Sequence, residues 1–337
     1  MRTENKNFIC HFVDHGMIEK QAISDYLEDT FQRTIPDISE GQAAVLVTCQ
    51  RAELYCFGEL NRELAAEILG PLMDNAHTIR GTTKVLRRLS EIAAGAHSWL
   101  LGEEYIEHQV QRAFSHTKEN TQLRWLGNKA IQIAKKVKVQ HEFRSIRDYP
   151  EIALDIAEDA TKRWSVDENA LFIIGGGMLG RALVNAALQR NWNEITLITR
   201  TPKKLRRLLS NKCIISKLSD LPTVNPGCGF CIVIASLDLD DDYKQRIAEL
   251  ASSVNCFGII DLSARRTFSA PPSDLYIHMY GKRFSDIVTK NNFELGIKLP
   301  ELLGAISDMA ERSIQGIFPE EDFKFKAAEE PPLGFNR

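Results

Sequence analysis

The chain has 337 residues, which is enough for about two domains of average size. Hydrophobic residues make up 44% and charged residues 26%, a balance that excludes a wholly disordered or collagen-like chain. The 42 basic and 45 acidic side chains give a net charge of −3, so any contact with nucleic acid must be local. No apolar run approaches the ~18 residues of a membrane helix, and the polar N-terminus lacks the apolar segment of a signal peptide, so we expect no membrane contact.

The seven cysteines are an odd number and lie mostly in apolar, strand-like stretches. A chain of this size needs no disulfides for stability, so we expect free thiols and a cytoplasmic location. Cys228 and Cys231 have CxxC spacing, but neither a second pair nor a nearby histidine accompanies them. Core or loop cysteines are therefore favoured over a metal site, and no metal is predicted.

Residues 1–148 are predicted to form an α+β domain. Alternating and helical spacings of apolar residues indicate strands at 8–13, 43–48 and 54–58, and helices at 18–33 and 61–73. From residue 81 to about 164 the spacing is nearly all helical. Its last part, 149–166, has Pro150 in the first turn and is predicted to be a helix that connects two domains.

In residues 167–290 short apolar runs alternate with helical patterns, which is typical of a parallel, doubly wound sheet. The expected strands and helices lie at 171–174, 178–190, 195–199, 203–209, 213–215, 230–234, 241–251 and 257–261. Residues 291–337 hold most of a final helix, 284–317, and a charged, Pro-rich tail that is predicted to be disordered. The expected fold class is α/β: an N-terminal α+β domain, a connecting helix, a Rossmann-type domain and a short C-terminal helix.

Gly175, Gly177 and Gly180 form a GxGxxG motif that follows an apolar strand and opens a helical pattern. The first glycine permits a tight turn, the second lets the backbone reach a pyrophosphate, and the third allows the helix to pack on the strand. The helix N-terminus then faces the phosphate charge. We predict that a dinucleotide binds Gly175, Gly176, Gly177, Met178, Leu179 and Gly180.

The next predicted strand ends at Thr199-Arg200-Thr201. An NAD enzyme usually has an acidic residue there, which binds the ribose 2′-hydroxyl. This chain has hydroxyl groups and Arg200 instead, followed by basic side chains at 203, 204, 206 and 207. A 2′-phosphate suits these residues, so we predict NADPH as the cofactor, bound by Arg200 and Thr201. The alternative is a solvated, basic start of a helix.

The stretch around Cys49 is also informative. If its strand stays extended, Val45, Val47, Cys49 and Arg51 share one face, because side chains alternate along a strand. Arg51 would then lower the pKa of the Cys49 thiol and bind a carboxylate. The spacing alone leaves two interpretations open, a catalytic cysteine and a small core residue.

Taken together, these stretches resemble glutamyl-tRNA reductase. The resemblance is carried in chain order by TCQRAELY (48–55), AAGAHSWLLGE (93–103), QV (109–110), AKKV (134–137), the glycines of 175–180, RT (200–201) and GIIDLS (258–263). It extends from about residue 8 to 290.

The resemblance implies NADPH-dependent reduction of glutamyl-tRNA to glutamate-1-semialdehyde, the first step of tetrapyrrole (5-aminolevulinate) synthesis by the five-carbon route. The N-terminal domain would be catalytic: the Cys49 thiolate would form a thioester, which hydride from NADPH would reduce. A hinge helix at 149–165 would swing the nucleotide domain towards Cys49. Glutamate-1-semialdehyde aminomutase is the implied candidate partner. The implied substrate-binding residues are Thr48, Gln50, Arg51, Ser98, Glu103, Glu104, Tyr105 and Gln109.

The sequence departs from the family pattern at Gln50, Ala52, Arg88 and His97, where the family has Asn, Thr, His and Asp. Residues 297–337 are also shorter than the helical region through which the family dimerises, which leaves the oligomeric state open. The alternatives are a paralogous reductase of another aminoacyl-tRNA or thioester, a shikimate-type dehydrogenase, and a non-catalytic NADP- or tRNA-binding protein.

Three further groups of polar residues have simpler explanations. His15 lies near a family histidine, but a structural role is favoured. Asp238, Asp240, Asp241 and Asp242 are better explained by a helix N-cap and first turn than by a Mg²⁺ site. The basic stretch between 129 and 147 fits contact with tRNA phosphates and a solvated helix face equally well.

Overall fold

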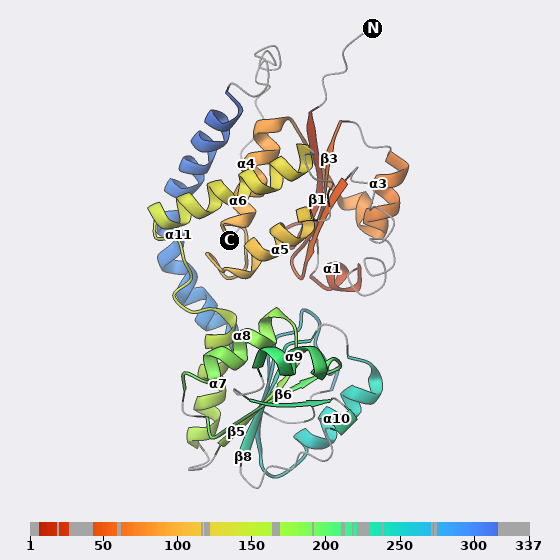
Figure 1. The fold of residues 1–337 in the computed structure, drawn as a ribbon, viewed down its shortest axis with the longest axis vertical. Helices are drawn as coiled ribbons and strands as arrows, with labels where there is room; N and C mark the ends of the chain where they lie inside the picture. The colour runs from red at the N-terminus through yellow and green to blue at the C-terminus, as the bar shows by residue number, and fades with distance from the viewer. Residues whose placement is uncertain are drawn as a thin grey trace.

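The computed structural model describes residues 7–18, 20–26, 43–58, 62–115, 117, 122–163, 169–190, 192–209, 213–217, 219–220, 229–236, 239–270, 272 and 275–315. These residues form two α/β bodies, one above the other in Figure 1. The expected fold class is therefore confirmed.

The first body contains an antiparallel sheet whose described strands lie in the order β2-β3-β1-β4. The strands are β1 (Phe8–Asp14), β2 (Ala43–Thr48), β3 (Arg51–Phe57) and β4 (His77–Arg80). One face packs on α4 (Thr82–Ala93), α5 (Tyr105–Ser115) and α6 (Gln122–Gln140). The other packs on α1 (Lys20–Tyr26), α3 (Arg62–Leu69) and the 3₁₀ helix η3 (Gly70–Asn75).

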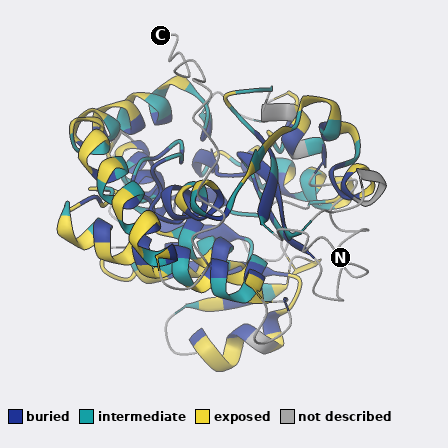
Figure 2. Ribbon diagram, turned by 90° about the horizontal axis from the view of Figure 1, so that it is seen from above, coloured by how far each residue is buried: buried dark blue, intermediate teal, exposed yellow. Residues whose placement is uncertain are grey.

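Because both faces of the sheet are covered, six of the seven residues of β3 are buried, including the charged Arg51 and Glu53. Tyr55 points into the core formed with α4–α6, whereas its neighbour Leu54 points into the core formed with α1 and α3. Figure 2 shows these strands as a dark blue interior, with exposed residues on the outer faces of the helices.

The second body contains a parallel sheet, with the described strands in the order β10-β9-β8-β5-β6-β7. Its strands are β5 (Asn169–Ile174), β6 (Glu194–Thr199), β7 (Ile214–Lys217), β8 (Gly229–Ile234), β9 (Cys256–Asp261) and β10 (Tyr276–His278). The helices are α7 (Tyr149–Arg163), α8 (Met178–Ala187) and α9 (Pro202–Leu209) on one face and α10 (Asp241–Ala251) on the other. This is the Rossmann-like domain expected from the alternating pattern.

Helices α7 and α11 join the two bodies. The buried face of α7 packs on β8 and β9, so this helix is a layer of the second body as well as a link. Helix α11 (Lys282–Ile314) begins in the second body, where Phe284 and Val288 are buried. It then returns to the first body and buries Leu302 and Ile306 beside α4 and α6. Figure 1 shows this blue helix along the side of the first body.

Several element predictions were wrong in detail. The strand predicted at 54–58 begins at Arg51, and the short strands β4 and β10 were not predicted. Strand β4 has only four residues and a mostly polar sequence, HTIR, so apolar alternation gave no signal. The predicted helix 18–33 is described as α1 up to Tyr26, and the rest of it lies outside the described residues, as do Trp164 and the tail from 316 onwards.

Candidate functional site

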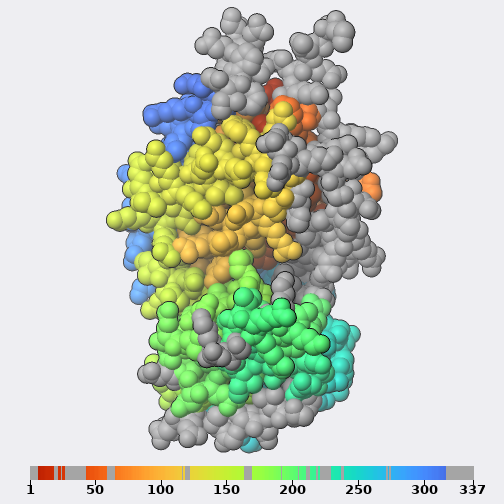
Figure 3. Space-filling view, viewed as in Figure 1, coloured from red at the N-terminus to blue at the C-terminus, as the bar shows by residue number. Residues whose placement is uncertain are grey.

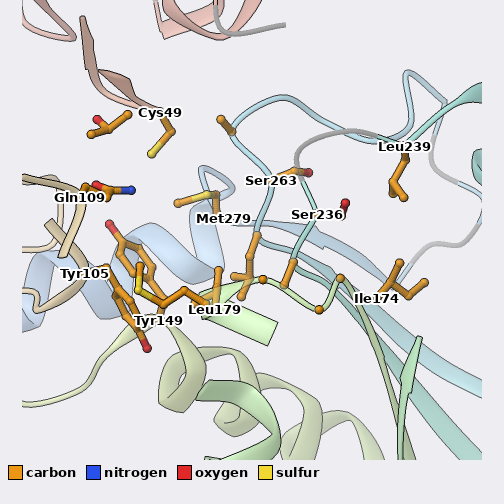
Figure 4. A pocket seen from close by; sticks show the side chains of 18 of the residues that line it. Cys49, Tyr105, Gln109, Tyr149, Ile174, Leu179, Ser236, Leu239, Ser263 and Met279 are labelled. Carbon is orange, nitrogen blue, oxygen red and sulfur yellow. The ribbon is translucent and has the colours of Figure 1, made fainter. Parts of the chain in front are cut away.

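A cavity of about 720 Å³ lies between the two bodies. In Figure 3 the yellow surface of α5 and α6 meets the green surface of the second body along this junction. Figure 4 shows Cys49 and Gln109 at one end of the cavity and Ile174, Ser236 and Leu239 at the other. One cavity thus reaches from the predicted cysteine to the predicted nucleotide loop.

The second-body wall of the cavity is built from the carboxyl ends of β5, β6, β8 and β9. Strand order reverses between β5 and β8, and parallel α/β sheets bind ligands at such a point. Gly175 directly follows β5, has φ +118°, and approaches β8 so closely that a Cβ would lie 2.5 Å from the carbonyl oxygen of Ala235. A Cβ on Gly180 would lie 1.8 Å from the carbonyl oxygen of Gly175. Two of the motif's glycines are therefore required by close packing.

The glycine loop leaves space for a phosphate group. Gly177 immediately precedes the first turn of α8, and a Cβ there would meet no atom within 4 Å. Beside the loop, Thr199, Arg200 and Thr201 line the cavity after β6. Among the described lining residues the acidic side chain is Glu103, which belongs to the first body. The residues present thus fit a dinucleotide, and the cation after β6 suits an additional phosphate.

Cys49 lies in a two-residue turn between β2 and β3, because Thr48 pairs directly with Arg51. The strand does not stay extended through Cys49, so the condition under which Val45, Val47, Cys49 and Arg51 would share one face is not met. The chain reverses at Cys49 and Gln50, which makes Arg51 the first residue of the next strand. The turn places the half-buried Cys49 at the cavity end of the hairpin.

Gln50 fixes this turn to neighbouring segments. Its backbone N–H donates to Thr48 Oγ1 (3.1 Å) and its carbonyl oxygen accepts from the N–H of His15 (2.9 Å). Its side-chain Oε1 accepts from the N–H of Trp99 (2.8 Å). Although Gln50 lines the cavity, its amide oxygen is therefore already used to position the turn.

Arg51 offers positive charge at the cavity wall. Its side chain is 1% exposed, and Nη2 donates to the carbonyl oxygen of His97 (2.5 Å). Nη1 lies 3.5 Å from Glu53 Oε1, but neither Nη1 nor Nε has a hydrogen-bond partner among the described residues. A buried guanidinium with unused donors is suited to bind an anionic group of a ligand.

Arg88 and His97 lie outside the cavity lining. Arg88 binds Glu53 (Nη2–Oε1 2.8 Å) and Asp14 (Nη2–Oδ2 3.4 Å), and its guanidinium stacks 3.3 Å from the ring centroid of Phe12. The Nε2 atom of His97 lies 2.8 Å from a carboxylate oxygen of Glu91. Neither side chain supplies a titratable group to the described cavity wall.

Glu103 is a buried carboxyl group in the same cavity. Its Oε1 accepts from Ser98 Oγ (3.3 Å) and its Oε2 from the N–H of Tyr105 (3.0 Å). Burial raises the pKa of Glu103 to about 7, because the charged form loses its hydration. Gln109 lines the cavity nearby, whereas Glu104 does not and instead forms an exposed ion pair with Arg144 (2.7 Å).

The pKa of the Cys49 thiol is raised above its ordinary value, although its neighbour Arg51 lowers it. Burial and the charge of Glu103 raise the pKa of Cys49, and these effects exceed the lowering by Tyr280 and Arg51. The expectation that Arg51 lowers the thiol pKa thus describes one contribution, and the net shift is upward.

Several lining residues were missed by the sequence analysis. Ser236 and Ser263 follow β8 and β9, so the rule that ligands bind at the carboxyl ends of strands would have found them. Tyr149 and Met279 also line the cavity. The segment after β10 also holds Tyr280, whose hydroxyl is one of the groups that lower the pKa of Cys49. These three residues carry no sequence signal, because only tertiary packing brings them to Cys49 and the cavity.

Other predicted features lie away from the cavity. Asp240 caps α10 by accepting from the N–H of Tyr243 (2.9 Å), which confirms the N-cap interpretation, while Asp238 lies outside the described residues. Cys231 is buried in β8, and its CxxC partner Cys228 is not described. In the described part of the chain no cluster of His, Cys, Asp and Glu could hold a metal ion, and no helix has the length and apolar character to cross a membrane.

Basic residues of the 129–147 stretch are in part paired with acidic ones. Lys135 lies 3.2 Å from Glu107, and Arg147 pairs with Asp155. This pairing fits a solvated helix face, and contact with tRNA stays a prediction.

Fold and cavity define a two-domain α/β protein in which a Rossmann-like domain and a cysteine-bearing α+β domain share one site. Residues 7–141 match the family model described as "Glutamyl-tRNAGlu reductase, N-terminal domain". This match supports a relation to that family for the first domain.

The similarity to known proteins extends beyond the first domain. The chain is 29% identical over 310 residues to Protein nfe2 of Rhizobium meliloti, covering 89% of this chain and 97% of that protein. It is 27% identical to the glutamyl-tRNA reductase of Thermosipho melanesiensis over 184 residues, and 23% identical to that of Methanopyrus kandleri over 198 residues. The chain spans about half the length of these reductases, 47% and 48%. The solved structure of the Methanopyrus kandleri reductase aligns with 92% of this chain and 80% of its own, at 17% identity and a TM-score of 0.48.

Proposed function

We propose that this protein is an NADPH-dependent reductase that converts glutamyl-tRNA to glutamate-1-semialdehyde through a thioester on Cys49. The observation that carries the proposal is the single cavity that holds Cys49, Arg51 and the glycine loop at Gly175–Gly177. The match of residues 7–141 to the reductase N-terminal domain supports the choice of substrate.

The chain's own residues suggest the order of events. The Cys49 thiolate attacks the ester carbonyl carbon, a C–S bond forms, and the C–O bond to the tRNA ribose breaks with protonation of the leaving oxygen. Arg51 binds the carboxylate of the glutamyl group with the donors that it leaves unused. The nicotinamide, when bound, supplies the hydride that reduces the thioester carbonyl. Cleavage of the C–S bond then returns the electron pair to sulfur and releases the aldehyde.

Glu103 is suited to move the thiol proton in this scheme. Its pKa of about 7 lets it accept a proton near neutral pH, and it interacts electrostatically with Cys49. The residue that the resemblance aligns with a family histidine is Arg88, which is bound to Glu53 and Asp14. A carboxyl group would therefore replace an imidazole as the titrating group.

The proposal is tested with purified protein, charged glutamyl-tRNA and NADPH or NADH. We expect semialdehyde with NADPH, little with NADH, and none from Cys49→Ser. Cys213→Ser is the matched control, because Cys213 is a free, partly exposed cysteine that is absent from the described cavity lining. Loss of activity in both variants, or activity retained by Cys49→Ser, would refute the thioester.

A second candidate is a reductase of a different aminoacyl-tRNA or acyl thioester. It is favoured by the departures from the reductase pattern beside the cysteine, at Gln50 and Ala52, and by Arg88 in place of the family's histidine. NADPH oxidation with another acyl-tRNA, and none with glutamyl-tRNA, would select this alternative.

A further inference from the structure

The loop after β9 forms part of the cavity wall. Residues 262–264, directly after the last residue of that strand, line the cavity, and so does Met279 after β10. Figure 4 shows Met279 and Ser263 between Cys49 and Ser236, the residue that follows the end of β8 by two positions. These four residues, 262–264 and Met279, here the β9 wall, therefore lie between the cysteine end of the cavity and β8.

The side chain of Asp261, the last residue of β9, is fully buried behind this wall and accepts four hydrogen bonds. Its Oδ1 accepts from the N–H of Ser263 (3.0 Å) and from the hydroxyl of the same residue. Its Oδ2 accepts from the N–H of Thr267 (2.8 Å) and from the hydroxyl of Tyr276. All four donors are neutral groups, and three of them belong to the loop. The carboxylate and the loop thus satisfy each other, and removing the carboxylate would leave buried donors without a partner.

Further hydrogen bonds connect the two segments of the β9 wall. The N–H of Met279 donates to the carbonyl oxygen of Asp261 (2.8 Å). His278 Nε2 donates to the carbonyl oxygen of Ser263 (2.9 Å), while its Nδ1 accepts from the N–H of Tyr280 (3.3 Å). The neutral imidazole with its proton on Nε2 satisfies both bonds. The wall is therefore fixed from behind, and Asp261 is bonded to both of its segments.

The place of the β9 wall in the sheet assigns it to one half of a dinucleotide. A dinucleotide bound at the switch point of a doubly wound sheet lies across it, with one half on either side. Arg200 after β6 suits a phosphate of the adenosine half, so the nicotinamide half belongs on the side of β8 and β9. That side also offers Leu262, Ala264 and Met279, whose apolar side chains suit a planar ring.

We propose that Asp261 is a positioning residue for the nicotinamide half of NADPH, and that its carboxylate holds the β9 wall in the shape against which the nicotinamide ring packs. The inference rests on the proposed function, which needs that ring near the thioester on Cys49. Asp261 is absent from the described cavity lining, so it acts through the wall. Its effect should therefore be confined to the nicotinamide half, because the glycine loop and Arg200 bind the remainder of the nucleotide.

The test compares the binding of NADPH and of 2′-phospho-ADP-ribose, which lacks only the nicotinamide ring, by calorimetric titration of the full-length protein. In Asp261→Asn an amide NH₂ replaces one acceptor oxygen, so the hydrogen bonds of the loop can no longer all form. We expect the dissociation constant of NADPH to rise about tenfold and that of 2′-phospho-ADP-ribose to change less than about twofold. Asp241→Asn is the matched control, because Asp241 is fully exposed on α10, and it should change neither constant.

Tyr276→Phe is a second variant, which removes one donor to Asp261 and keeps the ring that packs edge-on against Phe268 (centroids 5.8 Å apart, planes at 79°). It should weaken NADPH binding about threefold and again spare 2′-phospho-ADP-ribose. Equal weakening of both ligands, or unchanged NADPH binding, in Asp261→Asn overturns the proposal. If that variant does not fold, the same outcomes in Tyr276→Phe overturn it.

The measurement separates this inference from the proposed reaction. No tRNA is present, so a failure to reduce glutamyl-tRNA leaves the binding result standing. Unchanged selectivity between the two ligands overturns the role of Asp261 and leaves the thioester on Cys49 untouched. A wild-type protein that binds neither ligand would refute both the NADPH of the proposed function and the role of Asp261.

Discussion

The guanidinium of Arg88 holds the carboxylate of Glu53 with two hydrogen bonds, Nη2–Oε1 at 2.8 Å and Nε–Oε2 at 3.2 Å. Glu53 is fully buried and also accepts from the hydroxyl of Tyr55 (2.6 Å). The nearby cations Arg88 and Arg51 lower the pKa of Glu53 although burial opposes them. A two-point pair of this kind positions β3, whose first residue is the cavity residue Arg51.

Replacing Arg88 by methionine should lower the free energy of unfolding by about 3–5 kcal/mol, because it leaves the buried charge of Glu53 with a weaker partner. Urea unfolding at pH 7 measures the loss. The control is Arg87→Met, which removes a half-exposed i,i+4 pair with Glu91 and should cost less than about 1 kcal/mol. Equal losses in the two variants would show that the Arg88 pair is not specially stabilising.

Glu103 should make stability fall as pH rises through neutrality. Its pKa of about 7 lies above the ordinary value of 4.5, so the folded state binds the proton more tightly than the unfolded state. The penalty is absent below about pH 4 and complete above about pH 8. Glu103→Gln should therefore be more stable than the wild type at pH 8, by up to about 3 kcal/mol, and similar to it at pH 4.

Urea titrations at both pH values, beside Glu104→Gln, measure this difference. Glu104 is exposed and should leave the pH dependence as it is. In Glu103→Gln the pKa of Cys49 should also fall, since the carboxylate raises it. A pH dependence that persists in Glu103→Gln would identify another group as its source.

Gly177→Ala separates nucleotide binding from folding. A Cβ at this position meets no atom within 4 Å, so the melting temperature should stay within a degree or two of the wild type. If the pyrophosphate approaches this backbone, NADPH binding should weaken about tenfold or more. Gly180→Ala is the contrasting variant, because its Cβ would lie 1.8 Å from a carbonyl oxygen and should destabilise the domain. Unchanged NADPH binding in Gly177→Ala would place the pyrophosphate elsewhere.

Arg200 should distinguish NADPH from NADH. Arg200→Gln removes one charge-assisted contact, so the NADPH dissociation constant should rise by about tenfold while that of NADH changes less than about twofold. Fluorescence titration of both nucleotides measures the ratio. Arg207→Gln is the control, because Arg207 is exposed on α9 and absent from the described cavity lining. Equal weakening of both nucleotides would exclude contact with a 2′-phosphate.

The sequence by itself determined the features that depend on local pattern. Period-two and helical spacing located most strands and helices, because burial of one face or of both leaves a trace in the order of apolar residues. The glycine motif predicted the tight turn after β5. Gly175 lies so close to β8, and Gly180 so close to Gly175, that neither position has room for a side chain. The sequence around Cys49 also indicated a cluster of polar and charged residues, and Cys49 and Arg51 both line the cavity.

Only the tertiary structure decided what meets Cys49. The reversal at Cys49 and Gln50 depends on how β2 and β3 pair, which period-two alternation does not encode. Asn292 and Trp99 are 193 positions apart and meet because α11 returns to the first domain. Packing between elements likewise directs Arg88 to Glu53. Such contacts follow from the fit of side chains between whole elements, and the order of residues within any one element carries no record of them.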